Sequence, residues 1–132
     1  MLLVHRVLVL SKTKQKNMII SNAFSLNMFE TLEGEILSRE LSVTEISKEQ
    51  AVELLTDPEL GGVDSAVGHA DTAALFSTIL GIEIPCERKT IQLNPENGWL
   101  IVGQYHGPRL EEGSTTLPEG ASIRWYEIEI KS

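Results

Sequence analysis

The sequence predicts an α/β protein, a single domain built on a layered sheet. Short apolar segments with the two-residue spacing of strands alternate along the chain with segments whose apolar residues recur at helical spacing. The 132 residues, 42% of them hydrophobic, suffice for one ordinary core. The sequence contains no internal repeat, low-complexity tract or glycine fingerprint of a dinucleotide site that would indicate another architecture.

Residues 1–17, MLLVHRVLVLSKTKQKN, form a separate N-terminal extension whose apolar run precedes its basic residues. A signal peptide has the opposite order, and the run is too short to span a bilayer. Two interpretations are open: an extra edge strand over residues 4–10 followed by a basic loop, or residues upstream of the true start, with Met18 as initiator. The second is favoured because MIISNAFS begins a strand cleanly. We therefore expect the functional domain to span residues 18–132.

The first elements of this domain are expected to be a strand, a turn and a capped helix. Residues 18–21 form a short apolar strand, and residues 22–29 carry Ser and Asn side chains suited to a turn and a helix N-terminus. Residues 33–41 show only part of the spacing of a strand. Ser47 predicts a helix start, since Gln50 three residues later can complete a capping box. The TDPELGG stretch then ends this helix.

The middle of the chain predicts a short strand around residues 64–67 and a second helix over residues 71–80. Asp71 or Thr72 can serve the N-terminus of this helix, and Gly81 is the expected C-terminal stop. The remainder predicts three strands, in RKTIQL, GWLIVGQY and SIRWYEIEI. In the last of these, the apolar residues at every second position share one face.

The acidic composition and the single cysteine exclude some classes of function. A formal net charge of -8 argues against a protein that grips long duplex DNA or RNA through an extended basic face. A small anionic ligand stays compatible, because a pocket needs only a few well-placed cations. Cys86 cannot form an internal disulfide and lacks the paired spacing of a zinc site. We expect a cytoplasmic protein without a metal or cofactor, and no membrane partner.

His69 is the first candidate functional residue. It follows Gly68 and directly precedes the second helix, where unpaired backbone N–H groups and the positive end of the helix dipole attract phosphate. That field disfavours a protonated imidazole in an empty site, and a bound phosphate reverses the bias, leaving His69 ready to donate a proton. From the local sequence alone, a histidine hydrogen-bonded within a connecting loop is the favoured interpretation.

Two further groups of polar residues are candidates for ligand contact. Asn22, Ser25 and Asn27 follow the first strand, at the sheet edge where α/β proteins collect ligands, although Ser25 or Asn27 could simply cap a helix. Arg88 and Arg109 carry the planar fork that suits phosphate oxygens. The alternative for both arginines is a solvated charge at the end of a strand.

Together and in this order, SNAFSLNMF, AVGHADTAALFSTILG, ERKTIQL, LIVGQY and RLEEG, with an aromatic-rich C-terminal strand, resemble the small viral anti-CRISPR ring nucleases of type III systems. That family also has relatives on bacterial chromosomes. The resemblance covers the chain from Met18 onward, and NAFSLNM and GHADT are its most specific parts. It implies a homodimer with a mixed sheet flanked by helices and a ligand pocket at the dimer interface, in the host cytoplasm if the protein is virally encoded.

The resemblance further implies an activity and a role for each candidate residue. The activity is metal-independent cleavage of the second messenger cyclic tetra-adenylate into linear diadenylates, which switches off the ancillary effectors of type III CRISPR. His69 matches the catalytic histidine, and Glu112 matches an acidic residue that could support it, with Glu111 as the alternative. The expected ligand-contacting residues are Asn22, Ser25, Asn27, Gly68, Arg88 and Arg109.

The chemistry of RNA is compatible with this implied activity. A ribose 2′-OH held in line with the leaving 5′-oxygen can attack the phosphorus without external water or metal, and the product ends in a 2′,3′-cyclic phosphate. His69 suits the general acid that protonates the departing oxygen. A dimer with two-fold symmetry would present each of these residues twice to a cyclic tetranucleotide, which has a two-fold axis of its own. Two alternatives stay open: a non-catalytic binder that sequesters a cyclic oligoadenylate, and a small protein-interaction module.

Overall fold

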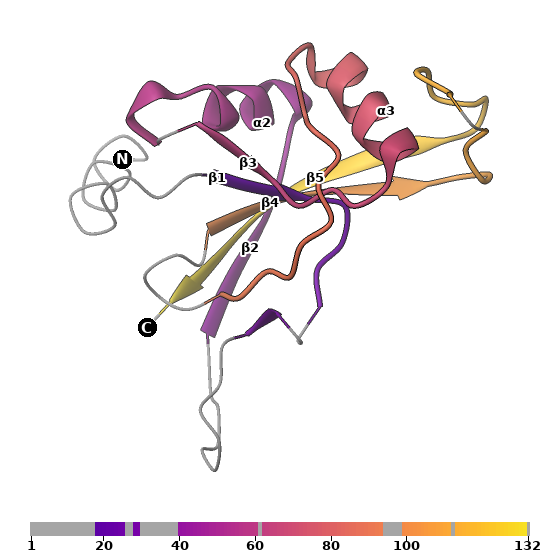
Figure 1. Ribbon diagram of the computed structural model, residues 1–132. Helices are drawn as coiled ribbons and strands as arrows, with labels where there is room; N and C mark the ends of the chain where they lie inside the picture. The colour runs from indigo at the N-terminus through magenta and orange to yellow at the C-terminus, as the bar shows by residue number, and fades with distance from the viewer. Residues whose placement is uncertain are drawn as a thin grey trace.

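The chain forms one mixed sheet in a computed structural model that describes residues 18–25, 28–29, 40–60, 62–93, 99–111 and 113–131. In these ranges the sheet has five strands in the order β2-β5-β4-β1-β3 (Figure 1). Their bounds are β1 (Met18–Ser21), β2 (Glu40–Ile46), β3 (Val63–Ser65), β4 (Trp99–His106) and β5 (Ser122–Lys131). β1 pairs in parallel with β3 and β4, whereas β5 pairs antiparallel with β4 and β2. The predicted α/β class with a mixed sheet is confirmed.

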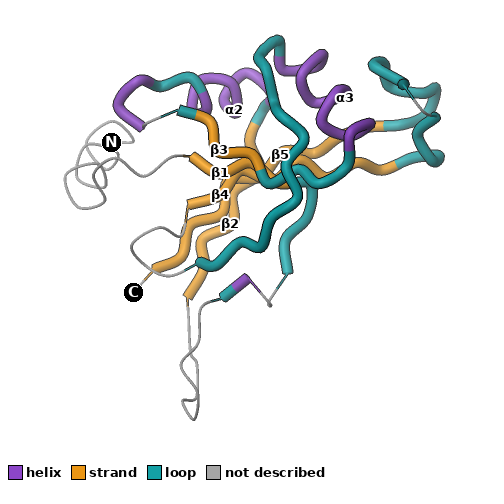
Figure 2. The backbone as a smooth tube through the Cα atoms, in the orientation of Figure 1, coloured by secondary structure: helices purple, strands orange, loops and turns teal. Residues whose placement is uncertain are grey.

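Two helices, α2 (Lys48–Leu55) and α3 (Ala70–Leu80), lie over the same face of the sheet (Figure 2). The capping box predicted for α2 is present: the Gln50 N–H donates to the Ser47 hydroxyl at 3.0 Å, and the Ser47 N–H donates to the Gln50 side chain at 2.9 Å. The α3 helix ends at Gly81 as predicted, in the left-handed conformation with φ 71°. Neither helix in the described part of the chain is long and apolar enough to cross a bilayer.

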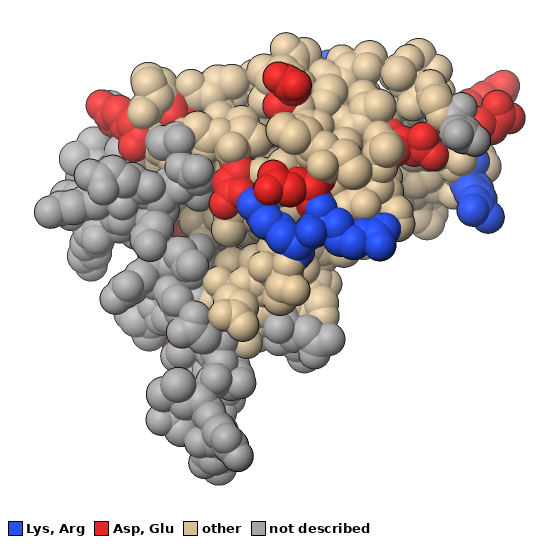
Figure 3. All heavy atoms as spheres, in the orientation of Figure 1, with Lys and Arg blue, Asp and Glu red and all other residues tan. Residues whose placement is uncertain are grey.

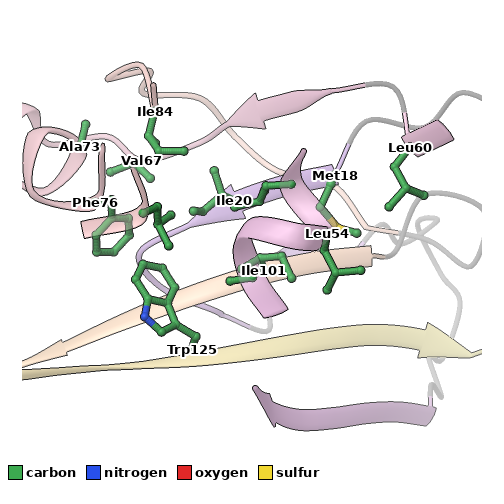
Figure 4. Close-up of a cluster of buried hydrophobic side chains, with 13 residues drawn as sticks. Met18, Ile20, Leu54, Leu60, Val67, Ala73, Phe76, Ile84, Ile101 and Trp125 are labelled. Carbon is green, nitrogen blue, oxygen red and sulfur yellow. The ribbon is translucent and has the colours of Figure 1, made fainter. Parts of the chain in front are cut away.

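The helix-covered face contains the larger of two buried clusters (Figure 4). Its buried members are Met18, Ile20, Ala51, Leu54, Leu55, Leu60, Val67, Ala73, Phe76, Leu80, Ile84, Ile101 and Trp125. The Phe76 and Trp125 rings meet edge to face with centroids 4.9 Å apart. Gly103 lies beneath them, and a Cβ atom there would come within 2.7 Å of the Phe76 ring and closer still to Trp125. This position therefore needs glycine for packing.

In the part of the chain that the structure describes, the opposite face is covered by chain that forms no α-helix and no strand. A second buried cluster lies there, made of Ala66, Ile91, Leu93, Leu100, Val102, Ile128 and Ile130. Residues 88–93 cross this face, and Leu93 donates its N–H to the Met28 carbonyl. Phe24 and Phe29 pack beside the cluster with their rings edge to face. Irregular segments thus bury the apolar side chains of this face, as the helices bury those of the other face.

Several sequence-based expectations are wrong in their details. RKTIQL forms no strand; within residues 88–93 only Leu93 makes an isolated bridge, to Phe29. Ile91 and Leu93 are buried, but the segment crosses the sheet face and pairs with none of the five described strands. The described part of residues 22–29 contains no α-helix. The strand expected over 64–67 is Val63–Ser65.

The region between β1 and α2 also differs from expectation. A strand was expected over residues 33–41, but β2 is Glu40–Ile46, and residues 33–39 lie outside the described residues. The shift follows from pairing, because every residue of β2 has a partner on the long strand β5. The strand suggested for residues 4–10 also lies outside the described residues.

Candidate functional site

A pocket of about 450 Å³ lies beyond the carboxyl ends of the parallel strands β1 and β3. Three stretches line it: the chain after β1, the connection between β3 and α3, and residues 88–91. Of the residues predicted from sequence, the pocket brings together Asn22, Ser25, Gly68, His69 and Arg88. These residues are far apart in sequence, and only the fold makes them neighbours.

His69 occupies the N-cap of α3 with extended backbone angles, φ −120° and ψ 129°. Its carbonyl accepts the first helical hydrogen bond, from the Ala73 N–H at 2.9 Å. Its side chain makes no capping bond and is exposed at the pocket. Asp71 and Thr72, the expected caps, instead lie within the first turn. The imidazole is thus free of the structural task that an N-cap side chain usually performs.

Hydrogen bonds join the His69 connection to the segment of residues 85–91, which we call the strap. The Ser65 hydroxyl donates to the Pro85 carbonyl at 2.6 Å and accepts the Val67 N–H at 3.2 Å. The Glu87 N–H donates to the Val67 carbonyl at 2.8 Å. Since Ser65 and Val67 are buried, these bonds are shielded from water and hold the strap against the β3–α3 connection.

The strap brings Arg88 next to His69. A Cβ atom placed on Gly68 would lie 3.6 Å from the Arg88 Cβ, so the arginine side chain starts in contact with the residue before the histidine. Among the described residues, no carboxylate pairs with the Arg88 guanidinium, whereas the neighbouring Lys89 pairs with Asp64. On the face shown in Figure 3, basic side chains gather in a band beside a group of acidic ones, where the chain that follows α3 crosses the view in Figure 1.

The chain after β1 contributes hydroxyl and amide groups to the pocket. Ser21, only 3% exposed, donates its hydroxyl to the Ala23 carbonyl at 2.9 Å and accepts the Ala23 N–H at 3.3 Å. This tight turn presents Asn22 and Ser25 at the pocket. Ser21 and Thr90 also line it and were not singled out from the sequence, whereas Lys89, which the sequence suggested as a solvated charge at the start of a strand, lines it as well. The position of Ser21 directly beside Asn22 is the signal that could have found this serine.

The other predicted residues do not line this pocket or cannot be placed. Arg109 is exposed in the connection between β4 and β5 and is not part of the pocket lining. That connection is tied to α3 because the Gly113 N–H donates to the Asp71 carboxylate at 3.1 Å. Asn27 and Glu112 lie outside the described residues. Glu111 is described and exposed.

The pocket has the chemical groups to bind a phosphate and to give it a proton. A guanidinium without a competing carboxylate, serine hydroxyls and an asparagine amide are donors or acceptors suited to phosphate and ribose oxygens. The imidazole of His69 is the side chain there with the chemistry of a general acid. Within the described ranges, no three His, Cys, Asp or Glu side chains gather as a metal site requires.

The chain belongs to the STIV B116-like family, whose sequence profile matches residues 18–126. Among solved structures, B116 of Sulfolobus turreted icosahedral virus (STIV) is similar in fold, with a TM-score of 0.65 and 24% sequence identity. The similarity covers 86% of this chain and 98% of B116. No curated protein sequence matches the chain. The fold is therefore one that a viral protein also adopts.

Proposed function

We propose that this protein is a metal-independent ring nuclease that binds cyclic tetra-adenylate and cleaves it into linear diadenylates, thereby switching off the ancillary effectors of type III CRISPR. The observation that carries the proposal is the convergence of Asn22, Ser25, Gly68, His69 and Arg88 on one pocket. The motif resemblance to ring nucleases supplies the substrate, and the pocket chemistry is compatible with it.

In the proposed reaction, a ribose 2′-oxygen of the ring attacks the adjacent phosphorus. The new bond to phosphorus forms as the bond to the 5′-oxygen breaks, which leaves a 2′,3′-cyclic phosphate. The imidazolium of His69 gives its proton to the departing 5′-oxygen, and the 2′-hydroxyl proton passes to solvent. Arg88 stabilises the charge that develops on the phosphoryl oxygens. Asn22 and Ser25 hold the ribose and phosphate in line.

The size of the pocket supports the action of two copies of the chain on one ring. A volume of about 450 Å³ suits a drug-sized molecule and is too small for four nucleotides at once. A homodimer with two-fold symmetry would offer two such pockets to opposite phosphates of the ring. In this arrangement Arg109, which does not line the pocket, would approach the ring from outside it.

The proposal is tested by incubating the protein with labelled cyclic tetra-adenylate in EDTA and resolving the products by chromatography and mass. We expect the wild type to yield diadenylate with a cyclic phosphate end. His69→Ala should bind the ring and lose roughly 10²- to 10⁴-fold in turnover. His106→Ala is the matched control, because His106 is exposed at the end of β4 and does not line the pocket.

Three outcomes would contradict the proposed activity. Tight binding without conversion by the wild type would indicate a protein that sequesters the messenger. Absence of binding would exclude the ring as a ligand and favour an interaction module. Equal turnover by His69→Ala and His106→Ala would mean that His69 is not the acid.

A further inference from the structure

Two adjacent cations of the strap, Arg88 and Lys89, differ in their electrostatic surroundings. Both line the pocket, but Lys89 is paired with the carboxylate of Asp64, and no described carboxylate pairs with Arg88. Asp64 is the central residue of the edge strand β3, and its side chain is 31% exposed, against 35% for Lys89. A half-buried pair is screened less by salt than a fully exposed one. The positive charge of Lys89 is thus compensated within the protein, whereas that of Arg88 is not.

The ion pair is not required to anchor the strap. Backbone and hydroxyl contacts already hold the strap, from Ser65 to Pro85 and from Glu87 to Val67. Two buried residues provide these contacts, whereas the ion pair lies at the accessible rim. The main consequence of Asp64 is therefore electrostatic, since it lowers the positive charge that a ligand meets.

We propose that Asp64 is a specificity-determining residue that holds Lys89 away from the phosphates of a bound ligand. Arg88 then provides directional contact with a correctly placed phosphate, and a second, flexible cation that would attract any polyanion is withheld. This inference rests on the proposed function for the identity of the preferred ligand. It predicts that the pocket discriminates the cyclic ligand from linear oligoadenylates, including its own products, through Asp64.

The test compares the binding of fluorescent linear tetra-adenylate and of cyclic tetra-adenylate between 50 and 200 mM salt, about the range over which phosphate contacts are revealed. We expect Asp64→Asn to bind the linear probe roughly threefold to tenfold more tightly at the lower salt concentration. The plot of log affinity against log salt should become steeper by about 0.7, the value for one added contact with a single strand. The preference for the ring should fall accordingly.

Four further variants separate the effect of the freed lysine from other causes. Adding Lys89→Met to Asp64→Asn should return both affinity and slope to wild-type values. Glu53→Gln is the charge-matched control: Glu53 is exposed on α2, over the opposite face of the sheet, and its neutralisation should leave the linear probe unaffected. Asp64→Glu should preserve wild-type discrimination. Lys89→Met alone should change affinity for the linear probe by less than about twofold, because this lysine is already withheld.

The proposal is overturned if Asp64→Asn behaves like Glu53→Gln, or if its gain in affinity persists when Lys89 is also replaced. It is overturned equally if Lys89→Met alone weakens the linear probe threefold or more, a test that holds even if Asp64→Asn fails to fold. Failure of the wild type to bind the ring would contradict the proposed function instead. The linear probe would still decide the effect of Asp64 on Lys89.

Discussion

The two faces of the sheet are covered by different kinds of chain. On one face, α2 and α3 bury the larger cluster, with Phe76 and Trp125 packed over Gly103. On the other, the irregular chain around Phe24, Met28 and Phe29 and residues 88–93 cover a smaller cluster, and parts of both segments line the candidate pocket. Regular helices satisfy their own backbone groups, so they can cover a sheet with apolar side chains alone. Irregular chain leaves backbone and polar side-chain groups for other partners.

The residues that stabilise the fold and the residues that would bind a ligand therefore lie in different places. The helix-covered face carries residues that are buried and apolar, whereas the candidate ligand residues His69 and Arg88 are exposed. Substitutions within the helix-covered cluster should therefore change the free energy of unfolding, and those of exposed pocket residues should change ligand binding and turnover. Four sets of substitutions test this comparison, in order of decreasing expected effect.

The largest effect is expected from Phe76→Ala, which empties the centre of the helix-covered cluster. Loss of this fully buried ring should lower the free energy of unfolding by about 3–5 kcal/mol. Phe24→Ala is the comparison on the other face, where the ring is half-buried, and its loss should be smaller. Denaturant titration measures both, and equal losses would contradict the proposed division between the faces.

Arg88→Ala should instead lower turnover and leave the free energy of unfolding almost unchanged. We expect turnover of the ring to fall roughly 10²- to 10³-fold through loss of one preorganised donor. The free energy of unfolding should stay within about 0.5 kcal/mol of wild type, because the side chain is exposed. Arg124→Ala is the control, an exposed arginine 3.6 Å from Glu45 and outside the pocket. A similar loss of turnover in both variants would show that general charge, rather than position, matters.

A matched pair of glycine substitutions compares the two faces directly. Gly103→Ala would place its Cβ within the packing of Phe76 and Trp125, and overpacking of this kind costs about 1–3 kcal/mol. Gly68→Ala would place its Cβ at ordinary contact distance, 3.6 Å from Arg88, so the fold should tolerate it. Thermal unfolding should separate the two variants. Equal melting temperatures would show that the cluster over Gly103 relaxes freely.

The smallest effects are expected at the helix N-termini. Ser47→Ala removes the cap of α2 and should cost about 1 kcal/mol. His69→Asn places a preferred cap residue on α3, whose present N-cap side chain makes no capping bond, and should stabilise the protein by about 0.5–1 kcal/mol. The same variant should lose turnover. A destabilised His69→Asn protein would show that the histidine has a structural role.

Local sequence was sufficient where neighbouring residues alone set the conformation. The strand Met18–Ser21, the capping box of Ser47 and Gln50, and the stop at Gly81 were all predicted, since each depends on residues within one turn or strand. The failure at RKTIQL is instructive. Its alternation correctly marked Ile91 and Leu93 as buried, yet a strand also needs a partner edge, and this segment crosses the sheet face instead.

The features of the candidate site also divide into those that follow from local sequence and those that depend on long-range contacts. The kinds of groups present and their likeness to a family motif could be predicted from the residues alone, because side-chain chemistry and short spacing are local properties. Long-range contacts were needed to show that Asn22, His69 and Arg88 share a pocket while Arg109 does not line it, and that Asp64 pairs with Lys89. The parallel pairing of β1 with β3 and the buried anchors of the strap bring these segments together. Such contacts depend on residues far apart in the chain, which no short pattern encodes.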